Sequence, residues 1–453
     1  MSAISDFLRQ NRQRYVEELT TLVRFASVSA QPKHRADCAA CAAWLTEHFR
    51  NMGLQSKLHR TKGHPIVTAT TPRRPGAPTV LIYGHYDVQP PEPIELWRTP
   101  PFEPTVRAGK LFGRGASDNK GQFFAHVKAV EAYLKTGAPL PVNVIFLIEG
   151  EEEVGSLALA GFVKKHGRAL RPDYIVVSDT GMFSKQHPTV TLGTRGITAF
   201  ELRVDGPSRD LHSGVFGGSV ANPAMVLSQL LARCVDADGR VTVPGFYDDV
   251  VALTDAERRE LATLPFDEAA YAKLLGVPKL AGEKGQGTLA RRWVRPTFEI
   301  NGLSSGYQGD GSKTIIPAFA TAKITCRLVP DQQPEKIYRR IARHLKNICP
   351  ASVRLSIEDG HHCAAHFSSR NKTGTQAAAR ALVRVHGRAP VFVREGGSLP
   401  ILNEFKRWLG GEIVLVGLGL TDDNWHSPNE KMDLENYQRG IAVSVELLRE
   451  LSV

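Results

Sequence analysis

The chain has 453 residues and a formal net charge of +11, and its hydrophobic (42%) and charged (23%) fractions are ordinary for a globular protein. This length allows two domains with a core each, and the absence of repeats and low-complexity runs excludes fibrous, repeat and disordered classes. The basic residues are spread along the chain without interleaved aromatic residues, so no nucleic-acid partner is expected, although the positive charge suits attraction of anionic substrates.

The N-terminal segment, residues 1–24, alternates apolar and polar residues and predicts an amphipathic helix, not a signal peptide. No apolar stretch approaches the roughly 20 residues of a membrane helix, so we expect a cytoplasmic location and no membrane partner. Six scattered cysteines make a poor disulfide framework. Cys38 and Cys41 have zinc-ligand spacing, but their Ala-rich surroundings favour helix packing instead.

Four apolar runs rich in β-branched residues predict buried strands, at residues 79–83, 142–148, 174–177 and 412–416. Helical patterns lie between them, for example at 121–135 and 157–166. Strands that alternate with helices predict an α/β domain with a mostly parallel sheet and helices on both faces.

A different order of predicted strands and helices begins near residue 197. It comprises a strand (198–204), a helix that opens with Asn222 as N-cap and Pro223, a strand (322–328), a helix (333–347) and a strand (352–358). This order predicts a smaller α/β sandwich over 197–368, inserted into a discontinuous first domain made of 1–196 and 369–453. Residues 240–312 are Gly-rich and basic, and their pattern predicts no particular element.

Metal-competent or acidic residues follow each of the four predicted strands. They are His85 and Asp87, then Glu151, Glu152 and Glu153, then Asp179, and finally His426, with Asp118 in a glycine-punctuated loop before a helix. Ligands of open α/β sheets gather at the carboxyl ends of the strands, so we expect these side chains to converge.

Each cluster alone has an ordinary explanation, such as a packed histidine, a solvated acidic loop, a helix N-cap at Asp118 or a turn at Asp179. Together they supply two histidines and at least three carboxylates, which suits zinc, manganese or cobalt. That number exceeds the needs of one metal ion with an open position and favours two ions that share a carboxylate. The sequence therefore predicts a hydrolase with two metal ions.

Two further roles follow from local spacing. His85 and Asp87 are two residues apart and face the same way in extended backbone, so Asp87 is placed to hold the far ring nitrogen of His85. Within the acidic triplet, one carboxylate can bind metal while its neighbour accepts a proton from water. The residues alone do not decide which carboxylate does which.

Seven motifs carry a resemblance to a known family. They lie, in order, at 84–90, 113–121, 149–156, 210–214, 326–330, 394–398 and 426–430. Through them nearly the whole chain resembles the co-catalytic metallopeptidases that include carnosine dipeptidases, cytosolic non-specific dipeptidases, acetylornithine deacetylase and carboxypeptidase G. The non-specific dipeptidase branch is the closest match.

The resemblance implies a set of roles for the first domain. Two divalent ions per chain, with Zn²⁺ preferred and Mn²⁺ or Co²⁺ as alternatives, would be bridged by Asp118, whose peptide bond to Asn119 is expected to be cis. One ion would also be held by His85 and Asp179, and the other by Glu153 and His426. Glu152 would be the general base, acting on a hydroxide between the ions, and Asp87 the orienting group.

For the inserted domain, the resemblance implies a lid that forms a homodimer. His212 would reach the other subunit's site and stabilise the oxyanion, Arg327 would hold the substrate carboxylate, and Ser398 and Thr314 would add polar contacts. Taken alone, His212 could cap the turn at Asp210–Leu211 and Arg327 could be a surface charge on an edge strand. His361, His362 and His366 all compete for one further family histidine, which stays unassigned.

The predicted reaction is metal-dependent hydrolysis of the amide bond of dipeptides or similar short peptides. The nearest alternative is an N-acyl-amino-acid deacylase on the same scaffold, although the long 240–312 segment argues against it. A phosphoesterase with two metals suits the glutamate pair and Arg327 less well. A non-catalytic binding protein would be expected to lack a ligand or the base, and all are present here.

Overall fold

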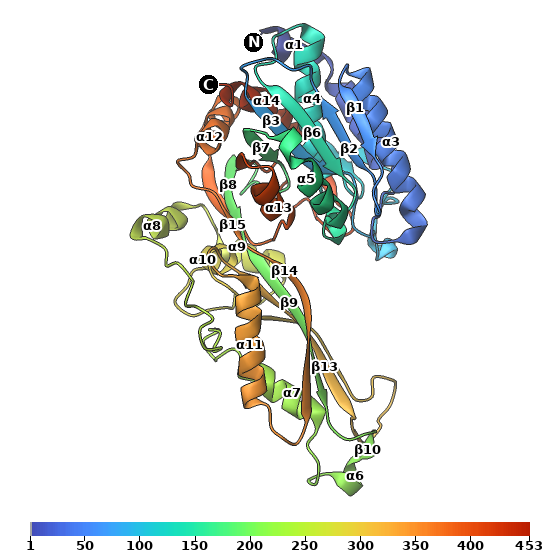
Figure 1. Ribbon diagram of the computed structural model, residues 1–453, viewed down its shortest axis with the longest axis vertical. Coiled ribbons are helices and arrows are strands. Elements are labelled where there is room, and N and C mark those ends of the chain that lie inside the picture. Colours follow the sequence, from blue (N-terminus) through green and yellow to red (C-terminus); the bar gives the residue numbers. More distant parts are fainter. Residues whose placement is uncertain (1) are drawn as a thin grey trace. The chain divides into compact units, whose positions relative to one another are not determined.

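The computed structural model describes residues 2–453, which form two compact units (Figure 1). Unit 1 comprises Met1–Gly193, Ser368–Val393 and Pro400–Val453, of which Met1 lies outside the described residues, and unit 2 comprises Thr194–Phe367 and Arg394–Leu399. The sequence places residues 394–399 in the first domain, and this boundary is wrong. Backbone N–H of Arg195 in unit 2 donates to the carbonyl oxygens of Glu395 and Gly397, at 3.2 and 3.0 Å, and so ties that segment to unit 2.

Unit 1 is built on a large mixed sheet. Its strands are β1 (Gln55–His59), β2 (Ile66–Thr70), β3 (Thr79–His85), β6 (Asn143–Glu149), β7 (Tyr174–Val177), β8 (Thr189–Thr194), β16 (Val391–Glu395) and β17 (Glu412–Leu415). The order is β1-β2-β6-β3-β7-β17-β8, and β16 also pairs with β8. The four predicted strands β6, β3, β7 and β17 run parallel in the middle, whereas β1, β2 and β8 pair antiparallel. The α/β prediction is therefore confirmed.

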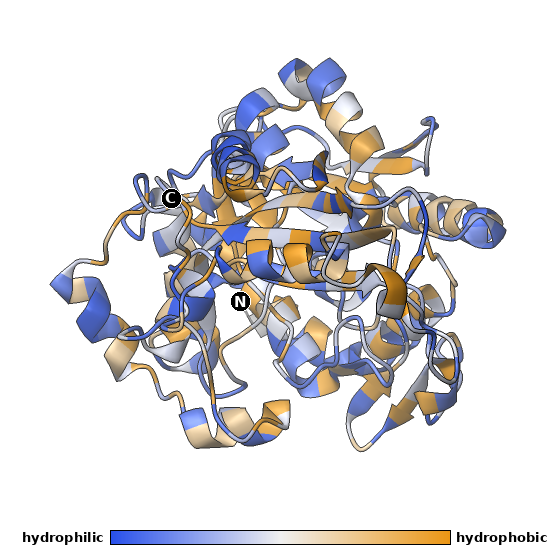
Figure 2. Cartoon of the chain, turned by 90° about the horizontal axis from the view of Figure 1, so that it is seen from below, coloured by the Kyte–Doolittle hydropathy of each residue, from blue (hydrophilic) through white to orange (hydrophobic). Residues whose placement is uncertain are grey.

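Helices cover both faces of this sheet. They are α1 (Ser2–Gln10), α2 (Arg12–Val23), α3 (Arg35–Asn51), α4 (Lys120–Thr136), α5 (Leu157–Leu170), α12 (Thr373–His386), α13 (Ile401–Trp408) and α14 (Leu434–Glu450). Side chains alternate along β3: Val80 and Ile82 join the core that includes α3, α4, α12 and α14. Tyr83 faces the opposite way and packs edge-on against Phe405 of α13, with 5.2 Å between ring centroids. In Figure 2, hydrophobic and hydrophilic residues alternate along the helices.

Short elements complete unit 1. A small sheet joins β4 (Thr105–Arg107), β5 (Lys110–Phe112) and β18 (Lys431–Asp433), and 3₁₀ turns cover Pro32–His34, Ile94–Leu96 and Glu152–Val154. The single helix predicted for 1–24 is wrong in detail, because α1 and α2 are separated at Asn11. Asn11 has φ of −100° and ψ of 9°, outside the helical region, although its backbone N–H still donates to the carbonyl oxygen of Phe7 at 3.1 Å. Cys38 and Cys41 are buried in α3, as helix packing predicts.

Unit 2 is an antiparallel sheet with helices on one face. Its elements are β9 (Gly196–Asp205), β10 (Leu211–His212), α6 (Ser213–Phe216), α7 (Pro223–Ala232), α8 (Asp255–Thr263), α9 (Glu268–Leu275), α10 (Thr288–Trp293), β11 (Glu299–Ser305), β12 (Ile315–Ile316), β13 (Phe319–Leu328), α11 (Pro334–Ile348), β14 (Arg354–Cys363) and β15 (His366–Phe367). The strand order is β11-β13-β9-β14, and α7 and α11 pack against it. Asn222 caps α7 as predicted, accepting a hydrogen bond from N–H of Ala224 at 2.9 Å. No helix among residues 2–453 is long and apolar enough to cross a membrane.

Candidate metal centre

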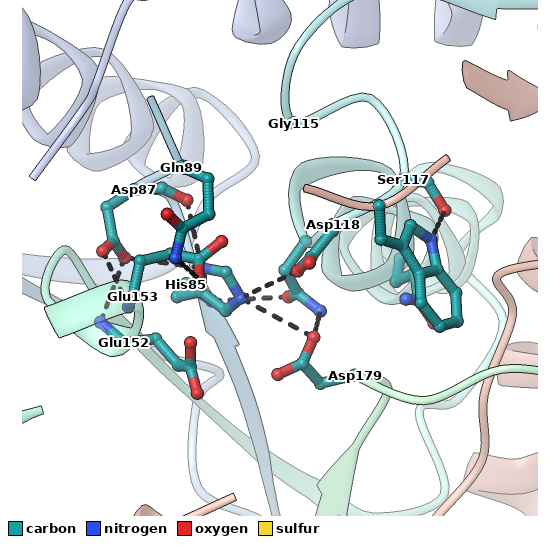
Figure 3. A network of polar contacts seen from close by, with 12 residues as sticks. His85, Asp87, Gln89, Gly115, Ser117, Asp118, Glu152, Glu153 and Asp179 are labelled. Atoms are coloured by element: carbon teal, nitrogen blue, oxygen red, sulfur yellow. Dashed lines mark hydrogen bonds and ion pairs between the residues drawn. The ribbon is translucent and has the colours of Figure 1, made fainter. Parts of the chain in front are cut away.

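Acidic and imidazole side chains meet at the carboxyl ends of the parallel strands of unit 1. His85 is the last residue of β3, Glu152 and Glu153 open the turn after β6, and Asp179 follows β7. Asp118 lies two residues before α4, and His426 lies between β17 and β18. Figure 3 shows His85 in the middle, pointing toward Asp118 and Asp179, with Asp87 on its other side.

Asp118 faces both histidines with different oxygen atoms. Nε2 of His85 lies 3.4 Å from Oδ1 of Asp118, and Nε2 of His426 lies 3.0 Å from Oδ2. The bond between Asp118 and Asn119 is a cis peptide, as the resemblance implies. A carboxylate whose two oxygens face two separate imidazoles has the arrangement of a group that bridges two metal ions.

Two sets of metal-competent atoms lie around this carboxylate. Those of His85, Glu152 and Asp179 fall within 4.8 Å of one another, and those of Asp118, Glu153 and His426 do so as well. All five predicted ligands are thus brought together, and Glu152, the predicted base, lies within reach of the first set. The side chain of His85 is fully buried and that of Glu153 nearly so, whereas His426 is more than half exposed.

The residues fit a pair of divalent ions. Nε2 of His85 is buried without a hydrogen-bond partner, so its lone pair or proton is unsatisfied by the protein. Four carboxylates, those of Asp118, Glu152, Glu153 and Asp179, crowd around two imidazoles. When ionised, the four carboxylates carry a negative charge that balances the positive charge of two divalent cations. The mixed nitrogen and oxygen donor set suits zinc, manganese or cobalt.

The crowding of charged groups shifts the pKa values of several residues in the centre. Burial raises the pKa of Glu152 well above its ordinary value, and the charges of Asp179 and Glu153 add to that effect against the opposing charge of His85. Hydrogen bonds with Asp118 and then Glu153 raise the pKa of His426 to about 10. Burial opposes ionisation of Asp118, but its hydrogen bond with His426 and the positive charges of His85 and His426 prevail and hold its pKa below the usual range.

The contacts of Asp87 differ from the expected ones. Nδ1 of His85 lies 3.0 Å from the carbonyl oxygen of Asp87 and 3.4 Å from its carboxylate. The carboxylate instead accepts from the backbone N–H groups of Glu152 (3.2 Å) and Glu153 (3.1 Å) and from Oγ of Ser29 (2.7 Å). Asp87 therefore positions His85 through its backbone and the two glutamates through its side chain. Nothing in the sequence pattern around Ser29 predicts this contact.

Two further side chains hold the ligands. Nε2 of Gln89 donates to Oε2 of Glu153 at 2.8 Å, and Nδ2 of Asn119 donates to Oδ1 of Asp179 at 2.7 Å. Gln89 and Asn119 belong to the motifs at 84–90 and 113–121, but the sequence pattern did not predict that they bond to Glu153 and Asp179.

The predicted substrate residues all lie in unit 2. Nδ1 of His212 accepts from N–H of Gly214 at 3.0 Å, so His212 does cap a turn, and it does so for α6 with its exposed ring. Ser213 N–H donates to the carbonyl oxygen of Thr314 at 3.1 Å, which places Thr314 beside His212. Nη1 of Arg327 donates to Oγ of Ser398 at 2.9 Å.

The surroundings of Arg327 are cationic and partly buried. β13 lies between β11 and β9, so the idea of an edge-strand surface charge is wrong. Burial lowers the pKa of Arg327, and burial together with Arg327 lowers the pKa of Arg195 to about 10. Partial burial lowers the pKa of His361, and the positive charges of His362 and Arg327 lower it further. His362 is bonded at Nδ1 to Oγ1 of Thr198, 2.8 Å away.

A third group of metal-competent residues, Glu18, His48 and Glu131, has a different character. Nζ of Lys128 lies 2.9 Å from Nε2 of His48 and 2.8 Å from Oε2 of Glu131, and it also contacts Glu18. The lysine ammonium already supplies the positive charge there, so this group is an ion-pair network.

Comparison with known proteins decides the family. The model of Peptidase family M20/M25/M40 matches residues 81–450. The chain belongs to this family. Its resemblance to the dipeptidase branch is confirmed, because Cys-Gly metallodipeptidase dug1 of Schizosaccharomyces pombe is 32% identical over 468 residues, covering 100% of this chain and 98% of that protein. The Beta-Ala-His dipeptidase of Homo sapiens is 35% identical over 395 residues, covering 86% of this chain and 78% of that protein.

The fold comparison agrees. The crystal structure of human carnosine dipeptidase 1 superimposes with a TM-score of 0.87 at 31% identity, covering 100% of this chain and 98% of that chain. This M20 protein is therefore a peptidase of the metal-dependent kind, with the fold of its family.

Proposed function

We propose that this M20 peptidase hydrolyses the peptide bond of dipeptides. The reaction would use two divalent metal ions, preferably Zn²⁺, bound at the centre around Asp118. The observation that carries the proposal is the pair of contacts from Asp118 to His85 and His426, one at each carboxylate oxygen. Asp179 would complete the ligands of the ion at His85, and Glu153 those of the ion at His426. When bound, the two ions would polarise the scissile carbonyl and make a water molecule between them more acidic.

Glu152 is the proposed general base. Its carboxylate lies with His85 and Asp179, and burial favours its proton-holding form. It would accept a proton from the attacking water while oxygen bonds to the carbonyl carbon, and deliver that proton to the amine nitrogen as the C–N bond breaks. Asp87 supports both steps because its carboxylate holds the backbone of Glu152 and Glu153.

Unit 2 would recognise the substrate. Arg327 and Ser398, already joined by a hydrogen bond, would bind the terminal carboxylate and so limit the substrate to short peptides. Thr314 would add a polar contact. His212 would donate to the developing oxyanion of the other subunit of a homodimer formed through unit 2, using the nitrogen that does not accept from Gly214.

The test is a substrate screen of the zinc-loaded protein. Cys-Gly and β-Ala-His are compared with N-acetyl amino acids of the same C-terminal residue, and Glu152→Gln controls for contaminating peptidases. Turnover of dipeptides above acyl-amino acids is expected, since the relatives described above are dipeptidases. Preference for the acyl substrates would favour the deacylase alternative instead.

A further inference from the structure

The carboxylate of Glu430 is buried inside the loop that carries Asp118. Oε2 accepts from Nη1 of Arg114 at 2.8 Å and from N–H of Gly115 at 2.8 Å. Oε1 accepts from N–H of Ser117 and from N–H of Asp118 itself, both at 3.0 Å. The Arg114–Glu430 ion pair is nearly inaccessible, with both side chains 1% exposed. One carboxylate thus accepts from three backbone N–H groups of the loop and from a buried guanidinium.

The same two loops are joined at a second point. Oγ of Ser117 donates to Oδ2 of Asp423 at 2.8 Å and accepts from Nε1 of Trp425 at 3.0 Å. Asp423 is in turn bonded to Nζ of Lys431 at 2.7 Å. The segment that contains His426 is therefore attached to the Asp118 loop on both sides of the histidine, through Asp423 and Trp425 before it and Glu430 after it.

The backbone between these attachments needs such support. His426 has φ of +57°, and Asn424 and Asn429 have φ of +59° and +62°. Asparagine tolerates the left-handed conformation, but for histidine it is unfavourable and persists where surrounding contacts hold it. Besides the contact of His426 with Asp118, the hydrogen bonds of Glu430 and Ser117 connect this segment to the Asp118 loop.

We infer that Glu430 is a positioning residue that fixes Asp118 and His426 relative to each other, and thereby sets the affinity of both metal positions. The inference rests on the proposed metal centre. It assigns Glu430 no contact with substrate or metal. Because Asp118 faces both positions, a shift of its backbone weakens both together, whereas loss of a ligand to one ion alone would not.

The test measures metal binding by the full chain. Glu430→Gln keeps the volume, but its amide NH₂ cannot accept from the two N–H groups it would face, and Arg114 loses its counter-charge. Zinc is titrated into metal-free protein in competition with a chromophoric chelator. Both zinc equivalents are expected to weaken by roughly 10- to 100-fold, the loss typical of groups that orient metal ligands. The rise in Tm on zinc addition should shrink accordingly.

A matched control separates positioning from general destabilisation. Glu450→Gln also removes a carboxylate that accepts from two arginines, Arg380 and Arg384, but in the C-terminal helix. It should lower Tm without changing zinc affinity. Should Glu430→Gln fail to fold, Glu430→Asp carries the test, since it keeps the charge near Arg114 but withdraws the carboxylate from the backbone of Ser117 and Asp118, and it is expected to weaken zinc binding several-fold.

The outcomes are distinguishable. Wild-type protein that binds no zinc would overturn the metal centre itself. If the wild-type protein binds two equivalents and a folded Glu430→Gln variant, or Glu430→Asp in its place, binds them with unchanged affinity, the positioning role alone is overturned.

Discussion

Nε2 of His426 lies 3.0 Å from Oδ2 of Asp118, while the other oxygen of that carboxylate faces His85. His426 comes from a loop near the C-terminus and Asp118 from the start of α4, so the contact joins two distant parts of the chain. It makes Asp118 common to both halves of the centre. Substitution of Asp118 is therefore expected to affect metal binding differently from substitution of His426.

Asp118→Ala should lose both metal ions, and His426→Ala should mainly lose one, because only Asp118 faces both positions. Chelation of the wild-type protein should abolish peptide hydrolysis, and zinc, manganese or cobalt should restore it. Metal content per chain, measured by elemental analysis after dialysis, checks the expectation. A single ion per chain in fully active protein at saturating metal would contradict the bridged arrangement.

Glu152→Gln and Glu153→Gln should fail in different ways. Glutamine at 152 removes the proton acceptor but keeps its size, so metal content should stay and kcat should fall by roughly 10² to 10⁴, the usual contribution of a general base. Glutamine at 153 should lower metal content, since Glu153 groups with Asp118 and His426. Parallel kinetics and metal analysis distinguish the two, and the reverse pattern would mean that the roles are exchanged.

The proposed homodimer makes a complementation test possible. If His212 serves the other subunit, His212→Ala and Glu152→Gln dimers should each be nearly inactive. A mixed dimer has one site with both defects and one intact site, because a two-fold interface exchanges contributions reciprocally. Co-expression in equal amounts makes half of the dimers mixed, so activity should recover to about a quarter of wild type. With subunit exchange confirmed by tags, activity at the parental level would rule out the contribution across subunits.

His126 should make the metal-free protein sensitive to mild acid. It is buried between the hydroxyls of Ser444 and Ser178, 2.7 Å from each, and burial lowers its pKa from 6.5 to about 4. Between these values the unfolded chain binds a proton that the folded chain does not, so stability is fully present above pH 6.5 and declines toward pH 4. A shift of this size corresponds to about 3 kcal/mol.

Urea unfolding of the metal-free protein across this pH range measures the effect. His126→Gln removes the titrating group, and its free energy of unfolding should therefore fall less steeply between pH 6.5 and 4 than that of the wild type. Equal slopes for the two proteins would show that another group is responsible.

The parallel core of the sheet and the residues at its strand ends were predictable from the amino-acid sequence alone. Apolar β-branched runs such as 79–83 and 174–177 specify buried strands locally, and parallel strands end at a common edge, so His85 and Asp179 had to lie near each other. The pattern named these residues as metal-competent, whereas the division into ligands and base, such as Glu153 and Glu152, came from the family resemblance. Residues 240–312 carried no comparable periodicity, and their three short helices α8, α9 and α10 were not predicted.

Which side chains support the predicted ligands was not predictable from the sequence and follows from the packing of the whole chain. Arg114 and Glu430 are 316 residues apart in the chain, and no local pattern connects them. The carboxylate of Asp87 lies 3.4 Å from the His85 ring but also accepts from the backbone of the glutamate turn and from Ser29, and residues 394–399 join unit 2 through Arg195. Hydropathy patterns report which face of an element is buried, whereas hydrogen-bond partners depend on where distant loops meet once the whole chain is packed.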